Sequence, residues 1–272
     1  MKRKIKFSNI FISICFVFFL IMFSFSLYQI IKWNIDARNT NETIDDLITS
    51  TKVEKIKDNS NTEIIPQENI DKSNPYWDYI NYDLINVDFN ELKEKNSDTV
   101  AWINVNGTNI NYPVVKTDNN DYYLTHSFNK SYNEAGWVFM DYRNTLNEDK
   151  NTIIYAHARL DKTMFGSLKD IIKDSWLKDD SNYVVKLSTE KENTLWQVFS
   201  VYKIPTTSDY LATEFYSDTE FNSFTNMLIN RSVYDFNTTV DSTDRILTLS
   251  TCYNNYDKVV LHAKLIKRET RN

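Results

Sequence analysis

The sequence predicts a mainly β domain, either a closed barrel or a sandwich, that follows one N-terminal membrane-spanning helix. Three observations support this fold class. About eight short segments have strand character, an Asn-Gly pair separates two of them, and only two longer segments have a helical pattern. The composition is that of a globular protein, and its 3 Gly and 4 Pro exclude collagen-like and low-complexity architectures.

The N-terminal helix is predicted from an apolar run without charges between Ile10 and Ile31. A helix needs about 20 such residues to cross a bilayer. A cleaved signal peptide would have a shorter apolar stretch, of about 7–15 residues, and a small-x-small exit. The segment Leu27–Ile31 offers no such exit. We therefore expect residues 10–31 to be an uncleaved anchor rather than a signal peptide or a buried core helix.

Flanking charges predict the orientation of this anchor. Lys2, Arg3, Lys4 and Lys6 precede the apolar run, whereas mixed charges follow it. The positive-inside bias places the tail of residues 1–9 in the cytoplasm and the remainder of the chain outside. The sequence thus predicts a single-pass protein of the cell membrane with an extracellular domain.

The exported part of the chain is acidic. After residue 33 it carries 26 basic and 37 acidic residues, which is a net charge of −11. Such a domain has no electrostatic reason to bind nucleic acid, so nucleic-acid partners are excluded. We assign no metal site and no cofactor.

Two segments follow the anchor. Residues 32–75 are polar, mixed in charge and poor in aromatic residues, and we expect a flexible extracellular stalk with at most short helical turns around Thr43–Leu47. Aromatic density rises at Tyr76-Trp77, where the folded domain of residues 76–268 is expected to begin. Its length of about 190 residues is normal for one domain.

Within this domain the elements are predicted in order. Asp88 and Glu91 form a capping pair that opens a short helix. Asn106-Gly107 is the strongest hairpin signal, because this pair accepts the positive φ angles of a tight turn. Helices are expected at Lys162–Ile172 and at Thr219–Asn230, where Phe221, Phe224, Leu228 and Ile229 form one apolar face. The eight expected strands are 99–105, 108–115, 136–140, 151–156, 183–187, 195–202, 245–251 and 259–265.

Cysteine usage points to one reactive residue. Cys15 lies in the apolar run, which leaves Cys252 as the only cysteine of the exported part. Exported proteins that use cysteine for stability carry pairs, and a lone thiol is either reactive or an inert buried side chain. Cys252 ends the strand Arg245–Thr251 and is followed by a polar, loop-like segment. A thiol at the end of a strand can meet a substrate, which favours a functional role.

A nucleophilic thiol needs a partner that exchanges protons, and histidine is the natural candidate. His157 ends an apolar strand before a polar segment, as Cys252 does. His262 lies within the last strand on the face of Lys258 and Lys264, which is expected to be solvated, and His126 lies in a loop-like stretch. His157 is therefore the preferred partner, although a single histidine is more often structural than catalytic.

Several motifs together resemble one family. Thr248-Leu-Ser-Thr-Cys252 matches the TLxTC signature of the sortases, and its Ser250 is typical of class B. Tyr155-Ala-His157 is similar to the strand-end histidine motif of the family, which usually has Gly in place of Ala156. Further segments that resemble class B are Phe139–Asn144, Lys162–Phe165 and Val260–Leu265, so the resemblance covers roughly residues 76–267.

The resemblance implies an eight-stranded sortase-type β-barrel with N-terminal helices and a helix between strands six and seven, for which Thr219–Asn230 is the candidate. It also implies a reaction. Cys252 would attack a peptide carbonyl in the C-terminal sorting signal of a secreted protein and form a thioacyl enzyme. An amine of a peptidoglycan precursor or of a pilin would then resolve it, with His157 transferring the protons.

By motif position, the resemblance also implies a substrate groove. Its residues would be Asn120, Leu124, Thr206, Tyr210, Leu211 and Ser250. Ordinary loop and barrel packing is the alternative explanation for all six.

One position departs from the family pattern. Sortases carry an arginine at the start of the strand after the cysteine loop, where it supports the substrate carbonyl, and alignment of the closing strand places Lys258 there. Lysine supplies the charge but not the planar fork of arginine. Either Lys258 acts in this role, or Arg143, Arg159 or Arg245 reaches the site, or the enzyme is weak.

Two other functions compete with a transpeptidase. A secreted papain-like cysteine hydrolase would also use Cys and His, but its nucleophile usually opens a helix instead of ending a strand. A sortase-like surface module that is catalytically weak or inactive is the second alternative, and the lysine at position 258 keeps it open.

Overall fold

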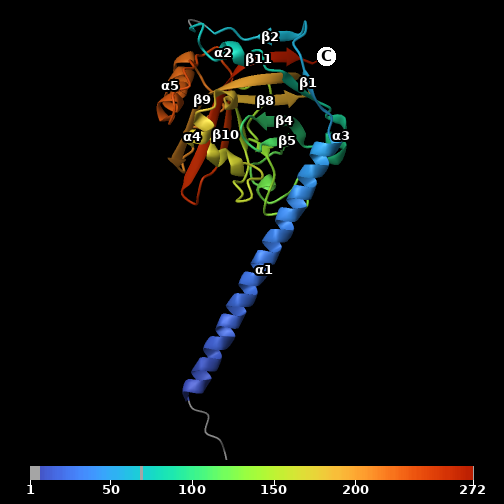
Figure 1. Cartoon of the computed structure of the whole chain (residues 1–272), viewed down its shortest axis with the longest axis vertical. Helices are drawn as coiled ribbons and strands as arrows, with labels where there is room; N and C mark the ends of the chain where they lie inside the picture. The colour runs from blue at the N-terminus through green and yellow to red at the C-terminus, as the bar shows by residue number, and fades with distance from the viewer. Residues whose placement is uncertain (1–6, 68–69, 272) are drawn as a thin grey trace, which may run out of the picture.

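The computed structural model describes residues 7–67 and 70–271, and Figure 1 shows a β-barrel from which one long helix extends. The basic side chains Lys2, Arg3, Lys4 and Lys6, on which the predicted orientation depends, lie outside the described residues. The limits predicted for the tail, anchor, stalk and domain remain predictions.

The barrel is a closed ring of eight strands. Its hydrogen-bonded order is β10-β7-β6-β5-β4-β8-β9-β11, and pairing between β10 and β11 closes the ring. The pairs β5–β6 and β7–β10 are parallel and the other pairs are antiparallel. The strands are β4 (Thr99–Val105), β5 (Asn111–Val115), β6 (Phe139–Met140), β7 (Asn151–Tyr155), β8 (Val184–Thr189), β9 (Glu192–Pro205), β10 (Ile246–Cys252) and β11 (Asp257–Thr270). The eight strands that the sequence predicts are confirmed. Of the two predicted arrangements, the closed barrel is correct and the sandwich is wrong.

Local sequence explains how the ring bends. The β4–β5 hairpin turns at Asn106-Gly107, where Gly107 has a φ of +68°. Other residues would be strained at this φ, and a Cβ there would also lie 2.1 Å from Asn182 Oδ1, so glycine is favoured at this turn. The two longest strands, β9 and β11, shift register at His262/Ala263 and again at Leu265/Lys267. Such bulges increase the local twist and help a sheet curl into a barrel.

The helices confirm one prediction and contradict another. Helix α5 (Asp218–Arg231) matches the expected segment, and Ser217 caps it by accepting a hydrogen bond from the Glu220 amide. The expected helix at Lys162–Ile172 is wrong, because only the 3₁₀ turn η2 (Gly166–Asp170) forms there. Lys162 and Met164 have φ angles of 68° and 51°, which interrupt a right-handed helix. The remaining short helices are α2 (Tyr76–Tyr79), α3 (Asn90–Lys95), η1 (Tyr122–Leu124), α4 (Asp174–Leu177) and η3 (Asp180–Asn182).

Much of the segment 32–67 has regular secondary structure, where the sequence predicts a flexible stalk with at most short helical turns. Helix α1 runs without a break over Phe7–Ser50, and among the described residues it alone is long and apolar enough to cross a membrane. Its second half is not free, since Thr40, Ile44 and Leu47 lie on one face and are buried against the barrel. The sequence analysis missed three short strands, of which β1 (Val53–Ile56) pairs with β3 (Leu84–Val87) and β2 (Thr62–Ile64) extends the sheet beside β11. These strands find their partners only through the tertiary fold.

Helix α5 covers a second, smaller core on the outside of the barrel. Phe221, Phe224 and Leu228 of the helix pack there against Phe199 and Val260 of the sheet. His262 is fully buried in this region, with its ring 5.9 Å from that of Phe199. The expectation that His262 is solvated is therefore wrong, because a helix covers the face of β11 that the strand pattern assigned to water.

Candidate active site

Three neighbouring strands carry the predicted reactive residues to one edge of the barrel. The parallel register pairs Tyr155 of β7 with Ser250 of β10, and two positions further along each chain come His157 and Cys252. Thr251 Oγ1 donates a 2.6 Å hydrogen bond to the Ala156 carbonyl and holds the two chains together beyond the last pair. On the other side of β10, the antiparallel register places Lys258 directly opposite Cys252. We call His157, Cys252 and Lys258 the reactive edge.

The thiol of the reactive edge is accessible and has a cation beside it. Cys252 is exposed, and Lys258 Nζ lies 3.0 Å from its Sγ atom. An ammonium group at this distance stabilises a thiolate, which is the nucleophilic form of cysteine. The contact follows from the register, because directly opposed residues of an antiparallel pair lie on the same side of the sheet.

His157 is held by one hydrogen bond that leaves its second nitrogen available. Its Nε2 atom lies 2.9 Å from the carbonyl oxygen of Leu124. Since a carbonyl only accepts, Nε2 carries the proton, and no hydrogen bond to Nδ1 occurs within the described part of the chain. Gly136 lies behind the ring, where a Cβ would approach His157 Cδ2 to 3.1 Å and the Tyr123 carbonyl oxygen to 2.5 Å. The ring is therefore fixed in place while Nδ1 can exchange a proton.

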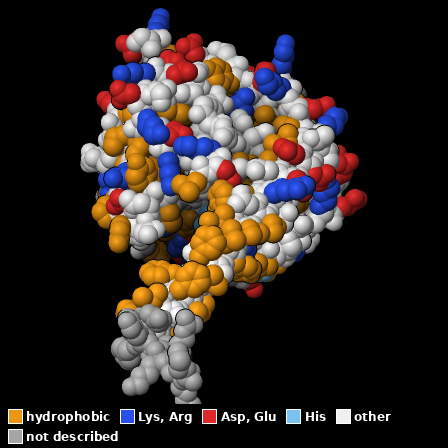
Figure 2. Space-filling view, turned by 60° about the horizontal axis from the view of Figure 1, so that its bottom comes forward, with side chains coloured by type: hydrophobic (Ala, Val, Ile, Leu, Met, Phe, Trp, Pro, Cys, Tyr) orange, Lys and Arg blue, Asp and Glu red, His pale blue; other side chains and the backbone are white. Residues whose placement is uncertain are grey.

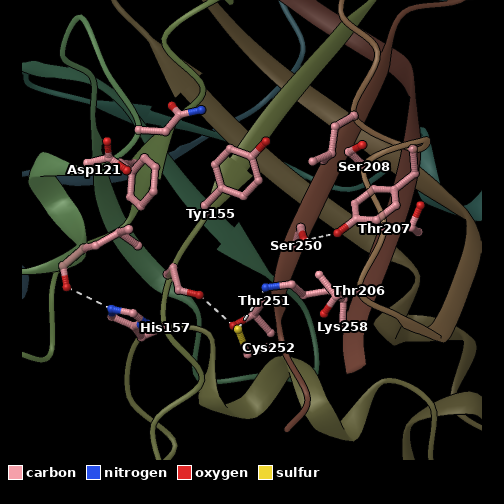
Figure 3. Close-up of a pocket in the computed structure, with 16 residues that line it drawn as sticks. Asp121, Tyr155, His157, Thr206, Thr207, Ser208, Ser250, Thr251, Cys252 and Lys258 are labelled. Atoms are coloured by element: carbon pink, nitrogen blue, oxygen red, sulfur yellow. Dashed lines mark hydrogen bonds between the residues drawn. The ribbon is translucent and has the colours of Figure 1, made fainter. Parts of the chain in front are cut away.

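A groove of about 750 Å³ runs along this edge, and Figure 3 shows how its side chains lie around Cys252. The structure brings every predicted site residue to this groove, although these residues come from separate parts of the chain. They are Asn120, Leu124, His157, Thr206, Tyr210, Leu211, Ser250, Cys252 and Lys258. Their roles stay predictions, with ordinary loop and barrel packing as the alternative explanation.

One wall of the groove is built around a carboxylate that the sequence analysis did not single out. Asp141 is fully buried and accepts hydrogen bonds from Arg143, from the Asn120 amide at 3.2 Å and from the Tyr155 hydroxyl at 2.8 Å. Arg143 also donates to the Leu211 carbonyl oxygen at 3.1 Å, which connects the opposite side of the groove. We call these five residues the bonded wall. The segment Phe139–Asn144 was noted only for its resemblance, and nothing in the sequence predicts that its acid is buried.

Electrostatics favour the charged form of this carboxylate. Burial alone would raise the pKa of Asp141, but hydrogen bonds from the Arg143 side chain and backbone and from Tyr155 outweigh it. The pKa of Asp141 therefore lies below its usual value. Burial conversely raises the pKa of Tyr155, which keeps its hydroxyl protonated as a donor to Asp141.

The far side of the groove is joined to β10 and to the loop after it. The Tyr210 hydroxyl lies 2.9 Å from Ser250 Oγ, and both side chains are buried. Burial raises the pKa of Tyr210. Thr206 bonds the Tyr256 carbonyl oxygen through its amide at 2.8 Å and through its hydroxyl at 3.0 Å. These contacts fix the β9–α5 segment, which carries Thr206, Tyr210 and Leu211, against the edge of the barrel.

The three arginines considered as substitutes for Lys258 are engaged elsewhere. Arg143 belongs to the bonded wall, Arg159 faces Trp33 of α1 at 5.7 Å, and Arg245 pairs with Glu192 at 2.9 Å near the opposite end of β10. None of them lines the groove, whereas Lys258 does. The lysine is therefore the cation nearest to the thiol among the residues that line the groove.

The other two histidines have structural surroundings. His126 stacks on Tyr122 with ring centroids 4.1 Å apart. His262 bonds Tyr202 through Nε2 at 2.8 Å and Thr248 through Nδ1 at 2.9 Å, and burial lowers its pKa to about 3. In residues 7–67 and 70–271, no group of three or more His, Cys, Asp or Glu side chains is arranged to hold a metal ion.

Comparison with known proteins places this geometry in a family. The Sortase domain family matches residues 103–266. Sortase B of Staphylococcus aureus (strain NCTC 8325 / PS 47) is 36% identical over 184 residues, which cover 66% of this chain and 75% of that protein. The structure of a Staphylococcus aureus sortase B–substrate complex superposes with a TM-score of 0.62 at 36% identity, covering 66% of this chain and 84% of that one.

A second solved structure covers more of the chain. A Bacillus anthracis protein described as similar to sortase B superposes with a TM-score of 0.65 at 32% identity, over 88% of this chain and 98% of that one. Together with the eight-stranded closed barrel, these matches show that the chain belongs to the sortase family and is a cysteine transpeptidase of the class B type.

Proposed function

We propose that the chain is a membrane-anchored sortase whose nucleophile is Cys252. The observation that carries this proposal is the reactive edge, where an exposed thiol has the Lys258 ammonium at 3.0 Å. His157 follows the neighbouring strand β7, two residues after Tyr155, just as Cys252 lies two residues after Ser250, the partner of Tyr155. The substrate would be the C-terminal sorting signal of a secreted protein. The acceptor would be an amine of a peptidoglycan precursor or of a pilin.

The first half of the reaction forms a thioester. The Cys252 thiolate attacks the scissile carbonyl carbon, and the carbonyl oxygen takes up negative charge in the tetrahedral intermediate. When the C–N bond breaks, protonated His157 gives its proton from Nδ1 to the leaving amine. The C-terminal fragment leaves, and the remaining acyl group is bonded to Sγ.

The second half returns the enzyme to its starting state. The acceptor amine attacks the thioester carbonyl and gives its proton to His157 Nδ1, while the C–S bond breaks and restores the thiolate. Nε2 stays protonated and bonded to Leu124 throughout, so the ring does not need to turn. Lys258 would stabilise the thiolate at both ends of the cycle and the oxyanion between them.

The groove supports recognition of an extended peptide. Its lining comes from separate segments: Asn120 and Leu124 from the β5–β6 connection, Thr206, Tyr210 and Leu211 from the β9–α5 segment, and Ser250 from β10, two residues before Cys252. The Staphylococcus aureus relative has been solved as a substrate complex, which supports a peptide ligand for the corresponding groove here.

The anchor supports action at the cell surface. Helix α1 is long and apolar enough to cross a membrane, and the basic residues before it favour a cytoplasmic N-terminus. Protease added to intact protoplasts should release a soluble fragment that contains the barrel. Protection of the barrel from protease would reverse the proposed orientation.

One incubation tests the chemistry against its alternatives. Purified protein is mixed with a sorting-signal peptide and an amine, and the products are identified by mass spectrometry. An amide product together with a trapped thioester on Cys252 supports the proposal. Acid as the sole product would indicate a cysteine hydrolase, and absence of both products would indicate a surface module without activity.

A further inference from the structure

Helix α1 connects the predicted membrane span to the barrel without a hinge. Its helical hydrogen bonding continues from Phe7 to Ser50, across the end of the apolar run at Ile31. Figure 1 shows the first half of α1 projecting from the domain and the second half resting on it. The direction of the span therefore determines the direction of the barrel.

The contacts between α1 and the barrel begin at the boundary of the apolar run. Lys32 forms an ion pair with Glu134 and lies 5.4 Å from the ring of Tyr132, and the ring of Trp33 lies 5.7 Å from the Arg159 guanidinium. Further along, Asn133 Nδ2 donates to Thr40 Oγ1 at 3.1 Å. The contacts of α1 with the barrel thus begin where the apolar run ends.

Helix geometry gives the depth in the membrane at which the end of the apolar run and its contacts with the barrel lie. A helix rises 1.5 Å per residue, so Lys32 and Trp33 lie within about 3 Å of the end of the apolar run. The headgroup layer on each side of a bilayer is roughly 5–8 Å thick. Trp at such a boundary is typical of the interface, and Lys can extend its ammonium outward. The barrel loops that contact these two residues must then lie in or against the headgroup layer.

The same loops border the reactive edge. Arg159 follows His157 by two residues, and Glu134 precedes Gly136, which packs on the His157 ring. Leu160, next to Arg159, is 84% exposed, and Tyr132 is 60% exposed. Figure 2 shows the apolar side chains of α1 running up to the domain beside a hollow in its surface. Exposed apolar side chains in this position have a natural partner in the lipid interface.

We propose that α1 holds the reactive edge against the headgroup layer of the membrane, with Tyr132 and Leu160 in contact with lipid. This inference rests on the proposed anchoring. Electrostatic attraction does not explain why the barrel would lie close to the membrane. The chain after residue 33 has a net charge of −11, and bacterial lipid surfaces are not basic. The rigid helix is what keeps an acidic barrel close to the bilayer. Substrates that present their cleavage site at the membrane surface are favoured as a consequence.

The test measures the depth of two labelled positions in the full chain. In a Cys15→Ala, Cys252→Ala background, a fluorophore is attached through Leu160→Cys or, as the control, through Asn226→Cys. Asn226 is an exposed residue of α5, which lies at the opposite end of the domain in Figure 1. In nanodiscs with nitroxide-labelled headgroups, we expect several-fold stronger quenching at position 160. Equal quenching at both positions would overturn the inference.

A linker variant tests the role of the helix itself. Insertion of about twelve Gly/Ser residues between Ile31 and Lys32 gives a flexible connection of roughly 20 Å and leaves the docked half of α1 unchanged. We expect quenching at position 160 to fall toward that at position 226. Undiminished quenching in the linker variant would show that α1 does not hold the barrel in place.

The outcomes separate this inference from the proposed function. Failure of the chain to float with vesicles would overturn the anchor and the inference together. Normal flotation with equal quenching would overturn the inference alone. Turnover of a soluble sorting-signal peptide by the native and linker proteins is measured independently, because the labelled background lacks Cys252. If the native protein does not turn over the peptide, the proposed chemistry is contradicted, while the depth measurement stays valid.

Discussion

The reactive edge and the bonded wall border the same groove but are constructed in opposite ways. The whole reactive edge lines the groove, whereas the wall lines it through Asn120, Tyr155 and Leu211 and keeps Asp141 and Arg143 behind them. Cys252 is exposed with one polar contact, and His157 has one hydrogen bond on one nitrogen. Asp141 is fully buried, and its two oxygens accept from three side chains of different segments. The comparison shows that the groups to which the proposed mechanism gives a change of charge or a new bond have few partners, whereas the groups that support the groove are saturated with partners. Mutations at the reactive edge should accordingly change the reaction rate, and mutations at the bonded wall should change substrate affinity or protein stability.

The largest expected effect is that of Cys252→Ala. Turnover of a sorting-signal peptide should be abolished, because no other described cysteine lies in the barrel to form a thioester. The thermal unfolding temperature should stay close to that of the parent protein, since the side chain is exposed at a strand end and fills no core. Retained peptide cleavage would show that the nucleophile is wrong, and an unfolded variant would favour the inert-thiol alternative.

Lys258→Ala should have the next largest effect. Loss of one electrostatic donor typically costs about 3–4 kcal/mol in the transition state, or roughly 100- to 1000-fold in rate. We expect kcat to fall by about this factor with a smaller change in KM, and Lys258→Arg to remain active or improve. Steady-state kinetics of both variants are the measurement. A near-normal kcat for Lys258→Ala would eliminate this role for the lysine.

Asp141→Asn tests the wall. The substitution keeps the shape of the side chain but removes its charge and replaces one of its two acceptor oxygens by an NH2 donor. Arg143 Nη2 and Asn120 both donate to the same oxygen, Oδ2, so they compete for the single acceptor that is left. We expect KM to rise about tenfold, equivalent to about 1.4 kcal/mol, while kcat changes less. Unfolding free energy should fall by about 2–3 kcal/mol.

A matched control for this variant is Asp170→Asn. Asp170 is paired with two lysines, Lys162 and Lys173, and neither of these partners lines the groove. Asp141, in contrast, accepts hydrogen bonds from Asn120 and Tyr155, which do line it. Its substitution should leave KM unchanged. An equal rise in KM for both variants would mean that Asp141 has no specific effect on the groove.

The smallest predicted effect concerns His262 of β11 and depends on pH. His262 is buried with a pKa lowered to about 3, so the folded state binds its proton far less readily than the unfolded state does. The contribution of neutral His262 to the free energy of unfolding is fully present above about pH 6.5. It decreases as the pH falls toward 3, by up to about 1.4 kcal/mol per pH unit. Denaturant unfolding between pH 7 and pH 5 measures it.

His262→Gln is the comparison for this measurement. Glutamine retains hydrogen-bonding atoms near Tyr202 and Thr248 but does not titrate. The pH dependence of stability between pH 7 and pH 5 should be weaker in this variant than in the parent protein. An identical slope in both proteins would assign the titration to other groups.

Sequence alone determined the barrel strands and supplied the candidates for the reactive residues. All eight barrel strands follow from residue pattern and turn chemistry, because the β period and an Asn-Gly turn are local properties. Cys252 and His157 stood out because each ends an apolar strand, and the family resemblance added Lys258 and the six groove positions, all of which line one groove. The sequence also indicated α5, whose apolar face and capping residue are contiguous in the chain.

Only the tertiary structure decided how these parts face one another. The parallel pairing of β7 with β10 sets His157 level with Cys252 across 95 residues of chain, and no local pattern encodes that register. The burial of Asp141 and His262, and the docking of α1 on the barrel, depend on partners from distant segments. The physical reason is that burial and hydrogen-bond pairing are properties of the assembled surfaces, whereas periodicity and turn preference belong to the chain itself.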